Sequence, residues 1–135
     1  MKIVYVDMVA DFFHWGHVNF LKKAKKFGDL LYVGIHNDKD IESYKRKPIM
    51  NMNERKIVLK SCKYVDKVIL NAPLSITKEH IKKHNIDLVV HAHNKDEDDK
   101  YYFMYKIPIE LGIFKRIDYT PKISTSNIIL RIMNS

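Results

Sequence analysis

Short runs of β-branched and aliphatic residues alternate along the whole chain with segments of helical periodicity. The expected strands cover residues 2–7, 30–36, 67–70, 87–91 and 114–117. The expected helices cover residues 17–27, 53–63, 78–84 after the cap Thr77, a short stretch at 102–105 broken near Pro108, and 125–133 after the cap Ser124. Such alternation is typical of βαβ units. We therefore predict an α/β fold: a Rossmann-like, doubly wound, mainly parallel sheet with helices on both faces.

The 135 residues are predicted to form a single domain, residues 1–135, because no linker or repeat divides them and 46% are hydrophobic, enough for one buried core. No apolar run approaches the roughly 20 residues that span a bilayer, and the first residues resemble a strand rather than a signal peptide. A cytoplasmic location without a membrane partner is the expectation. Gly28 is expected to end the first helix in a left-handed cap, and the lone Cys62 to be a buried helical thiol without a catalytic role.

The net charge of +8 predicts an anionic partner, which phosphorylated metabolites, nucleic acid and acidic lipid all provide. Four of the lysines, Lys22, Lys23, Lys25 and Lys26, have the spacing of the solvated face of an amphipathic helix. A basic nucleic-acid-binding domain is thus one hypothesis. The sequence contains no recognition-helix or aromatic stacking pattern that favours it, and we predict no nucleic-acid partner.

A histidine-rich turn follows the first expected strand, at residues 11–17. In parallel sheets of this kind ligands bind beyond the carboxyl ends of the strands, and the start of the following helix attracts anions. His14 and His17 flank Gly16, so both imidazoles can face a phosphate that the backbone approaches closely. The alternative is two solvent-exposed loop histidines. A zinc site is disfavoured because no third and fourth ligand have suitable spacing, and no metal site made by the protein is predicted.

Three hydroxyl side chains, Ser124, Thr125 and Ser126, open the last expected helix and form a second candidate anion site. A simple helix cap explains one of these hydroxyls and leaves the other two unexplained. Lys45 lies in a cationic loop, residues 45–48, after the second expected strand. Taken alone, this loop is interpreted as solvated surface.

The motifs His14-Trp15-Gly16-His17 and Ile123-Ser124-Thr125-Ser126 resemble the two signatures of the cytidylyltransferase family of the nucleotidyltransferase superfamily: His-x-Gly-His after the first strand, and Arg-Thr-x-Gly-Ile-Ser-Thr near the end. The segments at 50–55, 64–68 and 71–73 are similar to the choline-phosphate and ethanolamine-phosphate branch. The similarity covers nearly the whole chain, in order.

This resemblance implies an enzyme that transfers CMP from CTP to phosphocholine or phosphoethanolamine and releases pyrophosphate, in phospholipid headgroup synthesis. It implies Mg²⁺ as cofactor and a homodimer. His14, His17 and Lys45 are the implied catalytic residues. The implied CTP-binding residues are Val9, Asp11, Gly16, Arg55, His91, Thr120, Ser124 and Thr125. The implied acceptor-binding residues are Asp7, Lys45 and Tyr105.

For three of these residues the sequence leaves alternatives open. Asp11 either orients His14 or helps to coordinate magnesium, or it caps backbone N–H groups in a turn. His91 either contacts substrate or is a satisfied core histidine. Arg55 has a guanidinium suited to a carboxylate or a phosphate.

The chain also departs from the family pattern. Tyr119 replaces the arginine of the last signature and Lys122 its glycine, with Lys122 or Arg116 as candidate replacements for the lost charge. Further departures are Met8 for a glycine, Ala10 for an aromatic residue, Leu74 for a tryptophan, and Ala92 and His93 for an acidic pair. A degenerate nucleotide-binding module and a glycerol-3-phosphate cytidylyltransferase therefore stay open as alternatives.

Overall fold

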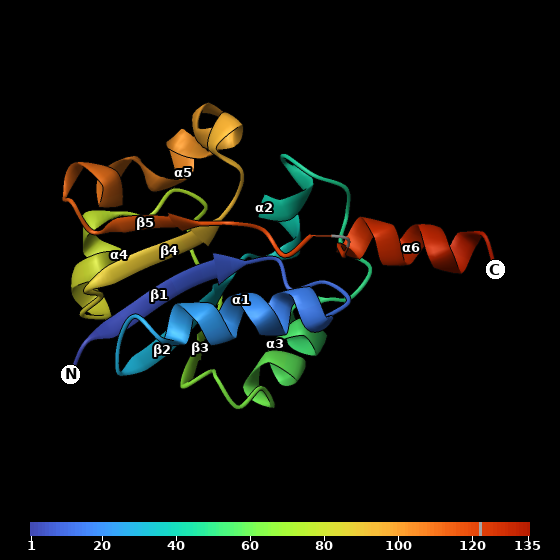
Figure 1. Ribbon diagram of the computed structural model, residues 1–135, viewed down its shortest axis with the longest axis horizontal. Helices are drawn as coiled ribbons and strands as arrows, with labels where there is room; N and C mark the ends of the chain where they lie inside the picture. The colour runs from blue at the N-terminus through green and yellow to red at the C-terminus, as the bar shows by residue number, and fades with distance from the viewer. Residues whose placement is uncertain (122) are drawn as a thin grey trace.

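Five strands form one parallel sheet in the computed structural model, which describes residues 1–121 and 123–135 (Figure 1). Their order is β3-β2-β1-β4-β5. The strands are β1 (Ile3–Met8), β2 (Leu30–Ile35), β3 (Lys67–Ile69), β4 (Leu88–Ala92) and β5 (Phe114–Ile117). The helices are α1 (Trp15–Lys25), α2 (Asp38–Glu42), α3 (Met52–Lys60), α4 (Lys78–Lys83), the 3-10 helix η1 (Lys95–Glu97), α5 (Asp98–Glu110) and α6 (Thr125–Met133). The predicted doubly wound α/β fold is confirmed, and the sheet is parallel throughout.

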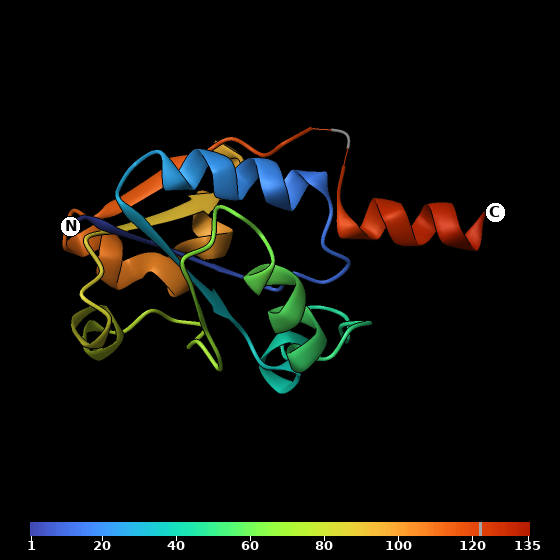
Figure 2. The same cartoon turned by 90° about the horizontal axis from the view of Figure 1, so that it is seen from below.

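The two faces of the sheet have separate cores, because successive side chains of a strand point to opposite faces. In β1, Val4 and Val6 pack with Leu21 of α1 and Leu59 of α3. Between them Tyr5 points to the other face. That second core contains Ile76, Ile86, Val89, Tyr101, Met104 and Tyr105. Figure 2 shows α1 above the sheet and α4 and α5 below it.

The central strands β1 and β4 separate toward their carboxyl ends. Their ladder pairs Val4 with Leu88 and Tyr5 with Val89, although the strands run on to Met8 and Ala92. Strand order reverses here, since β1 leads through α1 to β2 on one side and β4 leads through α5 to β5 on the other. The sheet therefore opens a crevice at its topological switch point.

Helix α5 is longer than predicted. It runs from Asp98 to Glu110 with Pro108 inside it, so the expected break near Pro108 is wrong. A proline leaves the carbonyl four residues earlier without its helical donor. Here that carbonyl, of Met104, accepts from the backbone N–H of Ile76 at 3.0 Å. A partner outside the helix thus removes much of the cost of the proline.

Three local predictions need correction. Gly112, not Gly28, has a positive φ; Gly28 is needed because a Cβ there would lie 2.9 Å from the carbonyl oxygen of Lys2. Cys62 follows α3 in a turn and is half-buried rather than buried within the helix. Helix α1 begins at Trp15, not at His17.

Helix α6 extends away from the body of the molecule, as both views show (Figures 1 and 2). None of its residues is buried, and Leu130, Ile132 and Met133 are exposed. Its first turn nevertheless lies against the turn that follows β1, where Thr125 contacts Asp11. Among the described helices, none combines the length and the apolar character needed to cross a bilayer.

Candidate active site

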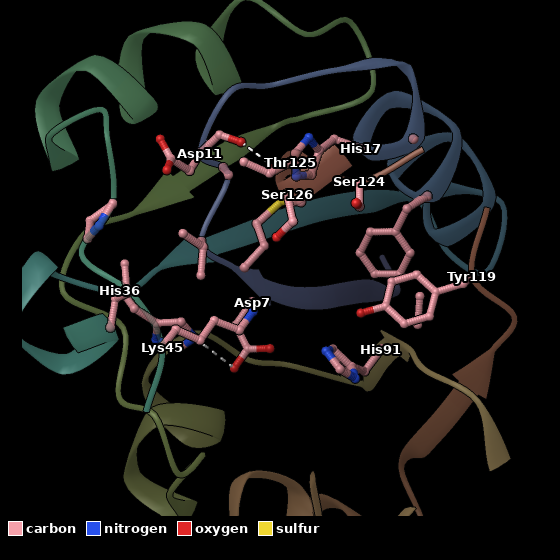
Figure 3. Close-up of a pocket in the computed structure, with 18 of the residues that line it drawn as sticks. Asp7, Asp11, His17, His36, Lys45, His91, Tyr119, Ser124, Thr125 and Ser126 are labelled. Carbon is pink, nitrogen blue, oxygen red and sulfur yellow. Dashed lines mark hydrogen bonds and ion pairs between the residues drawn. The ribbon is translucent and has the colours of Figure 1, made fainter. Parts of the chain in front are cut away.

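A pocket of about 500 Å³ lies beyond the carboxyl ends of β1 and β4. It contains every predicted site residue except Arg55. These are Asp7, Val9, Asp11, His14, Gly16, His17, Lys45, His91, Tyr105, Thr120, Ser124 and Thr125. Figure 3 shows two groups across the hollow: Asp11, His17 and the hydroxyls of α6 on one side, and Asp7, His36, Lys45 and His91 on the other.

The two motif histidines are held by the backbone at the start of α1. The N–H of Gly16 donates to Nδ1 of His14 at 3.1 Å, and the N–H of His14 donates to Nδ1 of His17 at 3.1 Å. Because each Nδ1 accepts, the neutral rings carry their hydrogens on Nε2. Nε2 of His14 is buried and has no partner among the residues that the structure describes. The turn thus presents a buried donor that an anion can satisfy.

The electrostatics keep both rings neutral. Burial lowers the pKa of His14. Burial also lowers the pKa of His17, to about 3, with His14 and Lys45 adding to the effect and Asp11 opposing it. At neutral pH the two imidazoles are therefore neutral N–H donors rather than cations.

Gly16 is required by the approach of the His14 ring. A Cβ on Gly16 would lie 2.8 Å from Cε1 of His14 and 3.0 Å from Cγ2 of Ile123. Any larger residue would push the ring off the backbone N–H that orients it.

Asp11 holds a neighbouring loop in place. Its carboxylate accepts from the N–H groups of Ile49 and Met50, each at 2.9 Å, and lies 3.3 Å from Arg46. Of the alternatives left open, backbone capping is the one observed, although the N–H groups belong to a distant loop and not to the turn of Asp11 itself. This anchoring supports the turn, in which Ala10 has a φ of 60°.

The start of α6 joins the histidine turn. Thr125 donates from Oγ1 to the backbone carbonyl of Asp11 at 2.7 Å (Figure 3). Ser124 is the N-cap and accepts from the N–H of Asn127 at 3.0 Å. Thr120 accepts from the amide of Asn19 at 2.8 Å, and Ser126 also lines the pocket. The two candidate anion sites therefore face one cavity.

Lys45 enters the same cavity from the loop after α2. Desolvation lowers its pKa, and the charges of Lys100 and Arg46 lower it further. Its ammonium lies 5.5 Å from the ring centre of Tyr44. Lys45 is exposed, as a surface loop residue is expected to be, but it also lines the pocket, where its ammonium can meet a phosphate.

The opposite wall presents a buried carboxylate. Asp7 Oδ1 accepts from the hydroxyl of Tyr105 at 2.6 Å, whereas Oδ2 is buried and has no hydrogen-bond partner among the described residues. Burial raises the pKa of Asp7, and His36 and Tyr105 oppose that rise. Such a carboxylate favours a ligand that brings hydrogen-bond donors and positive charge.

His91 lies beside this carboxylate and lines the pocket, so it is not a core residue alone. Its Nδ1 lies 2.8 Å from Nδ1 of His93, whose Nε2 lies 2.7 Å from Asp98. Burial and the neighbouring His93 lower the pKa of His91 to about 3. His93 was predicted only as a departure from the family pattern, and His36 was not predicted at all. Both follow strands, the position of ligand-binding residues in this fold.

Arg55 is structural. Its side chain is 0% exposed and donates to the carbonyls of Val9 at 2.7 Å, His36 at 3.0 Å and Met50 at 3.1 Å. A carboxylate partner, Asp38, lies at 2.5 Å. The guanidinium thus joins three loops around the pocket without lining it.

We expect Arg55→Met to lower the free energy of unfolding by about 3–5 kcal/mol, because three carbonyls lose the donor that the buried guanidinium supplies. Chemical denaturation measures the change. Lys60→Met, an exposed change in the same helix, is the control and is expected to stay within about 0.5 kcal/mol of the parent. Equal effects of the two substitutions would contradict this role for Arg55.

Of the two residues that depart from the last signature, the structure describes Tyr119. Tyr119 lines the pocket, and burial and Tyr101 raise its pKa to about 12, so its hydroxyl keeps its proton. Arg116 does not replace the missing arginine, because it contacts the carbonyl of His93 at 2.9 Å and Asp118 at 3.3 Å. Lys122, the other candidate, lies outside the described residues.

Comparison with known proteins identifies the family. A family model described as cytidylyltransferase-like matches residues 8–131. An ethanolamine-phosphate cytidylyltransferase of Arabidopsis thaliana is 41% identical over 137 residues, covering 98% of this chain and 32% of the relative. Choline-phosphate cytidylyltransferase 2 of the same plant is 39% identical over 134 residues, covering 96% of this chain and 44% of the relative.

A solved structure shares the fold. The lipopolysaccharide core biosynthesis protein of Thermoplasma volcanium GSS1 superimposes with a TM-score of 0.71 at 26% identity, covering 89% of this chain and 97% of that one. The chain spans 32% to 44% of the length of the two plant relatives. With the family model matched over most of its length, this chain belongs to the cytidylyltransferase-like family.

Proposed function

We propose that this chain transfers CMP from CTP to an amino-alcohol phosphate, phosphocholine or phosphoethanolamine, with release of pyrophosphate, in phospholipid headgroup synthesis. The observation that carries the proposal is a buried pair of atoms without partners among residues 1–121 and 123–135. They are Nε2 of His14 and Oδ2 of Asp7, in the same pocket as the hydroxyls of α6. Donors for a triphosphate thus lie across one cavity from an acceptor for a cationic headgroup. The plant relatives named above carry out this type of synthesis by name.

In the proposed reaction a phosphomonoester oxygen of the acceptor attacks the α-phosphorus of CTP. The new P–O bond forms as the bond from the α-phosphorus to the bridging oxygen breaks, and pyrophosphate leaves with that electron pair. No protein nucleophile is required. His14 and His17 donate from Nε2 to the phosphate oxygens on which charge develops, and Lys45 neutralises charge between the two substrates.

Mg²⁺ is proposed to arrive with the triphosphate rather than to occupy a site made by the protein. Across residues 1–121 and 123–135, no group of three or more His, Cys, Asp or Glu side chains is arranged to hold a metal ion. The carboxylate of Asp11 is already occupied by two N–H groups and Arg46. The phosphate oxygens of CTP are ligands that Mg²⁺ prefers.

We also propose that the protein acts in the cytoplasm, where its substrates are dissolved, and as a homodimer. The exposed apolar residues Trp15, Leu130, Ile132 and Met133 support an interface. Sedimentation equilibrium tests the assembly: a mass near twice 16.0 kDa is expected, and a mass of one chain at micromolar concentration would contradict it.

A turnover assay tests the function. The purified chain is mixed with CTP, Mg²⁺ and either phosphoethanolamine, phosphocholine or glycerol 3-phosphate, and pyrophosphate release is followed. We expect turnover with an amino-alcohol phosphate and little with glycerol 3-phosphate, which has no cation to meet Asp7. A higher melting temperature with CTP but no turnover would instead identify a degenerate nucleotide-binding module.

A further inference from the structure

A chain of three polar side chains extends from the pocket to the protein surface: His91, His93 and Asp98. Nδ1 of His91 lies 2.8 Å from Nδ1 of His93, and Nε2 of His93 lies 2.7 Å from a carboxylate oxygen of Asp98. His93 is buried, and Asp98 is exposed at the first turn of α5. His93 and Asp98 do not line the pocket, so they can act on a substrate only through His91.

The hydrogen-bond geometry sets the tautomer of His91. A carboxylate only accepts, so Nε2 of His93 carries a hydrogen, and the remaining Nδ1 of a neutral His93 accepts. The hydrogen between the two Nδ1 atoms therefore belongs to His91. Its Nε2 is left with a bare lone pair, on a ring that lines the pocket.

A second bare acceptor lies nearby. Oδ2 of Asp7 is buried and unpaired among the described residues, and Nε2 of His36 is 3.6 Å away, beyond hydrogen-bonding distance. The Nδ1 of His36 lies 3.1 Å from the carbonyl of Ala72, so the ring faces Asp7 through Nε2. The ring of Tyr105 connects the two sides, because its hydroxyl donates to Asp7 and its centre lies 4.7 Å from the ring of His91. Asp7 and His91 thus present lone pairs on the side of the pocket that also holds the ammonium of Lys45 (Figure 3).

We propose that the acceptor substrate carries a primary ammonium, as in phosphoethanolamine, and that His93 and Asp98 are positioning residues that keep His91 ready to accept one of its hydrogens. The proposal rests on the proposed function and specifies its acceptor. A primary ammonium has N–H donors for the lone pairs of Asp7 and His91. A trimethylammonium has none, and its binding leaves those buried acceptors unpaired, which is the strongest basis for rejecting a close analogue.

Aromatic rings also line this wall, and rings of this kind can bind a quaternary ammonium. The rings of Tyr105 and Tyr101 both pack against His91, at 4.7 Å and 4.8 Å between ring centres, and the hydroxyl of Tyr105 donates to Asp7. Leu74 packs in the core near these rings and adds no aromatic face. The buried unpaired acceptors therefore decide the preference.

The test compares kcat/KM for ethanolamine phosphate and its N-methyl, N,N-dimethyl and N,N,N-trimethyl derivatives with the intact protein, CTP and Mg²⁺. We expect a stepwise decline that reaches about 100-fold for the trimethyl compound, phosphocholine. Equal values, or a preference for phosphocholine, would overturn this inference and leave the proposed function in place. Turnover with none of the four would reject the proposed function itself.

Variants test the positioning residues. His93→Phe removes the acceptor for His91 and is expected to reduce the ratio of kcat/KM for phosphoethanolamine to that for phosphocholine by about tenfold, with KM for CTP unchanged. His93→Asn, whose amide oxygen can accept from His91, is expected to restore most of the ratio. A fall in total activity with an unchanged ratio would show a merely structural role.

Asp98→Ala provides a second route if His93→Phe does not fold, because Asp98 is exposed and its loss frees His93 and removes only a longer contact, at 3.8 Å, with Arg116. It is expected to lower the same ratio about threefold. Asp99→Ala, one residue along and also exposed, is the matched control and should leave the ratio unchanged. Identical ratios for the Asp98 and Asp99 variants would remove Asp98 from the proposal.

Discussion

Lys45→Ala is expected to lower kcat/KM by about 10²- to 10³-fold, the usual effect of removing one group that stabilises charge in a transition state. Among the described cations that line the pocket, Arg46 is paired with Asp11, whereas Lys45 has no carboxylate partner. Loss of Lys45 therefore leaves the negative charge of the attacking and leaving phosphates without this cation to neutralise it. Initial rates at saturating CTP separate the effect on kcat from that on KM.

Two further variants make the Lys45 result specific. Lys47→Ala removes an equal charge from an exposed position in the same loop and should change kcat/KM less than about twofold. Lys45→Arg keeps the charge and should recover only part of the activity, because the guanidinium is larger and planar. Similar losses for Lys45→Ala and Lys47→Ala would mean that the loop acts through general charge alone.

His17→Gln is expected to lower kcat by about 10²-fold or more while the fold persists. His17 has two roles: its Nδ1 accepts from the N–H of His14, which completes a capping box, and its Nε2 is available to a phosphate. Glutamine at this helix position can accept from the same N–H group. The substitution therefore keeps the cap and removes the imidazole donor.

Thermal melting provides the control for this variant. His17→Gln should keep its melting temperature within about 4 °C of the parent, whereas His17→Ala loses both roles and should melt lower. His84→Ala, a histidine outside the pocket, should leave kcat unchanged. A His17→Gln enzyme with full kcat would exclude the imidazole from the chemistry.

The features that are local in sequence were the predictable ones. The order of strands and helices follows from hydrophobic periodicity, and the carboxyl-end rule for parallel sheets places the histidine turn in the pocket. The N-cap at Ser124 was also correct, because a cap is formed by its own helix. The continuation of α5 through Pro108 was not predictable, since the compensating donor is the N–H of Ile76 in a distant segment.

Roles that depend on partners distant in sequence could not be predicted for the site residues either. Asp11 and Arg55 both form hydrogen bonds with groups far along the chain, to the loop at Ile49 and to the carbonyl of Val9, and no local pattern reveals such partners. His93 was visible only as a residue that differs from the family pattern. Its role depends on Asp98, five residues later, which the turn between β4 and α5 brings back within 2.7 Å.

Whether both helix starts bind one triphosphate is tested most directly by a crystal structure of the protein with Mg²⁺ and a CTP analogue whose α,β-bridging oxygen is replaced by a methylene group. We predict that one triphosphate is contacted by Nε2 of His14 and His17 and also by the first turn of α6, with its α-phosphate open toward Lys45. A triphosphate bound to only one of these two elements, or outside the crevice between β1 and β4, would contradict it.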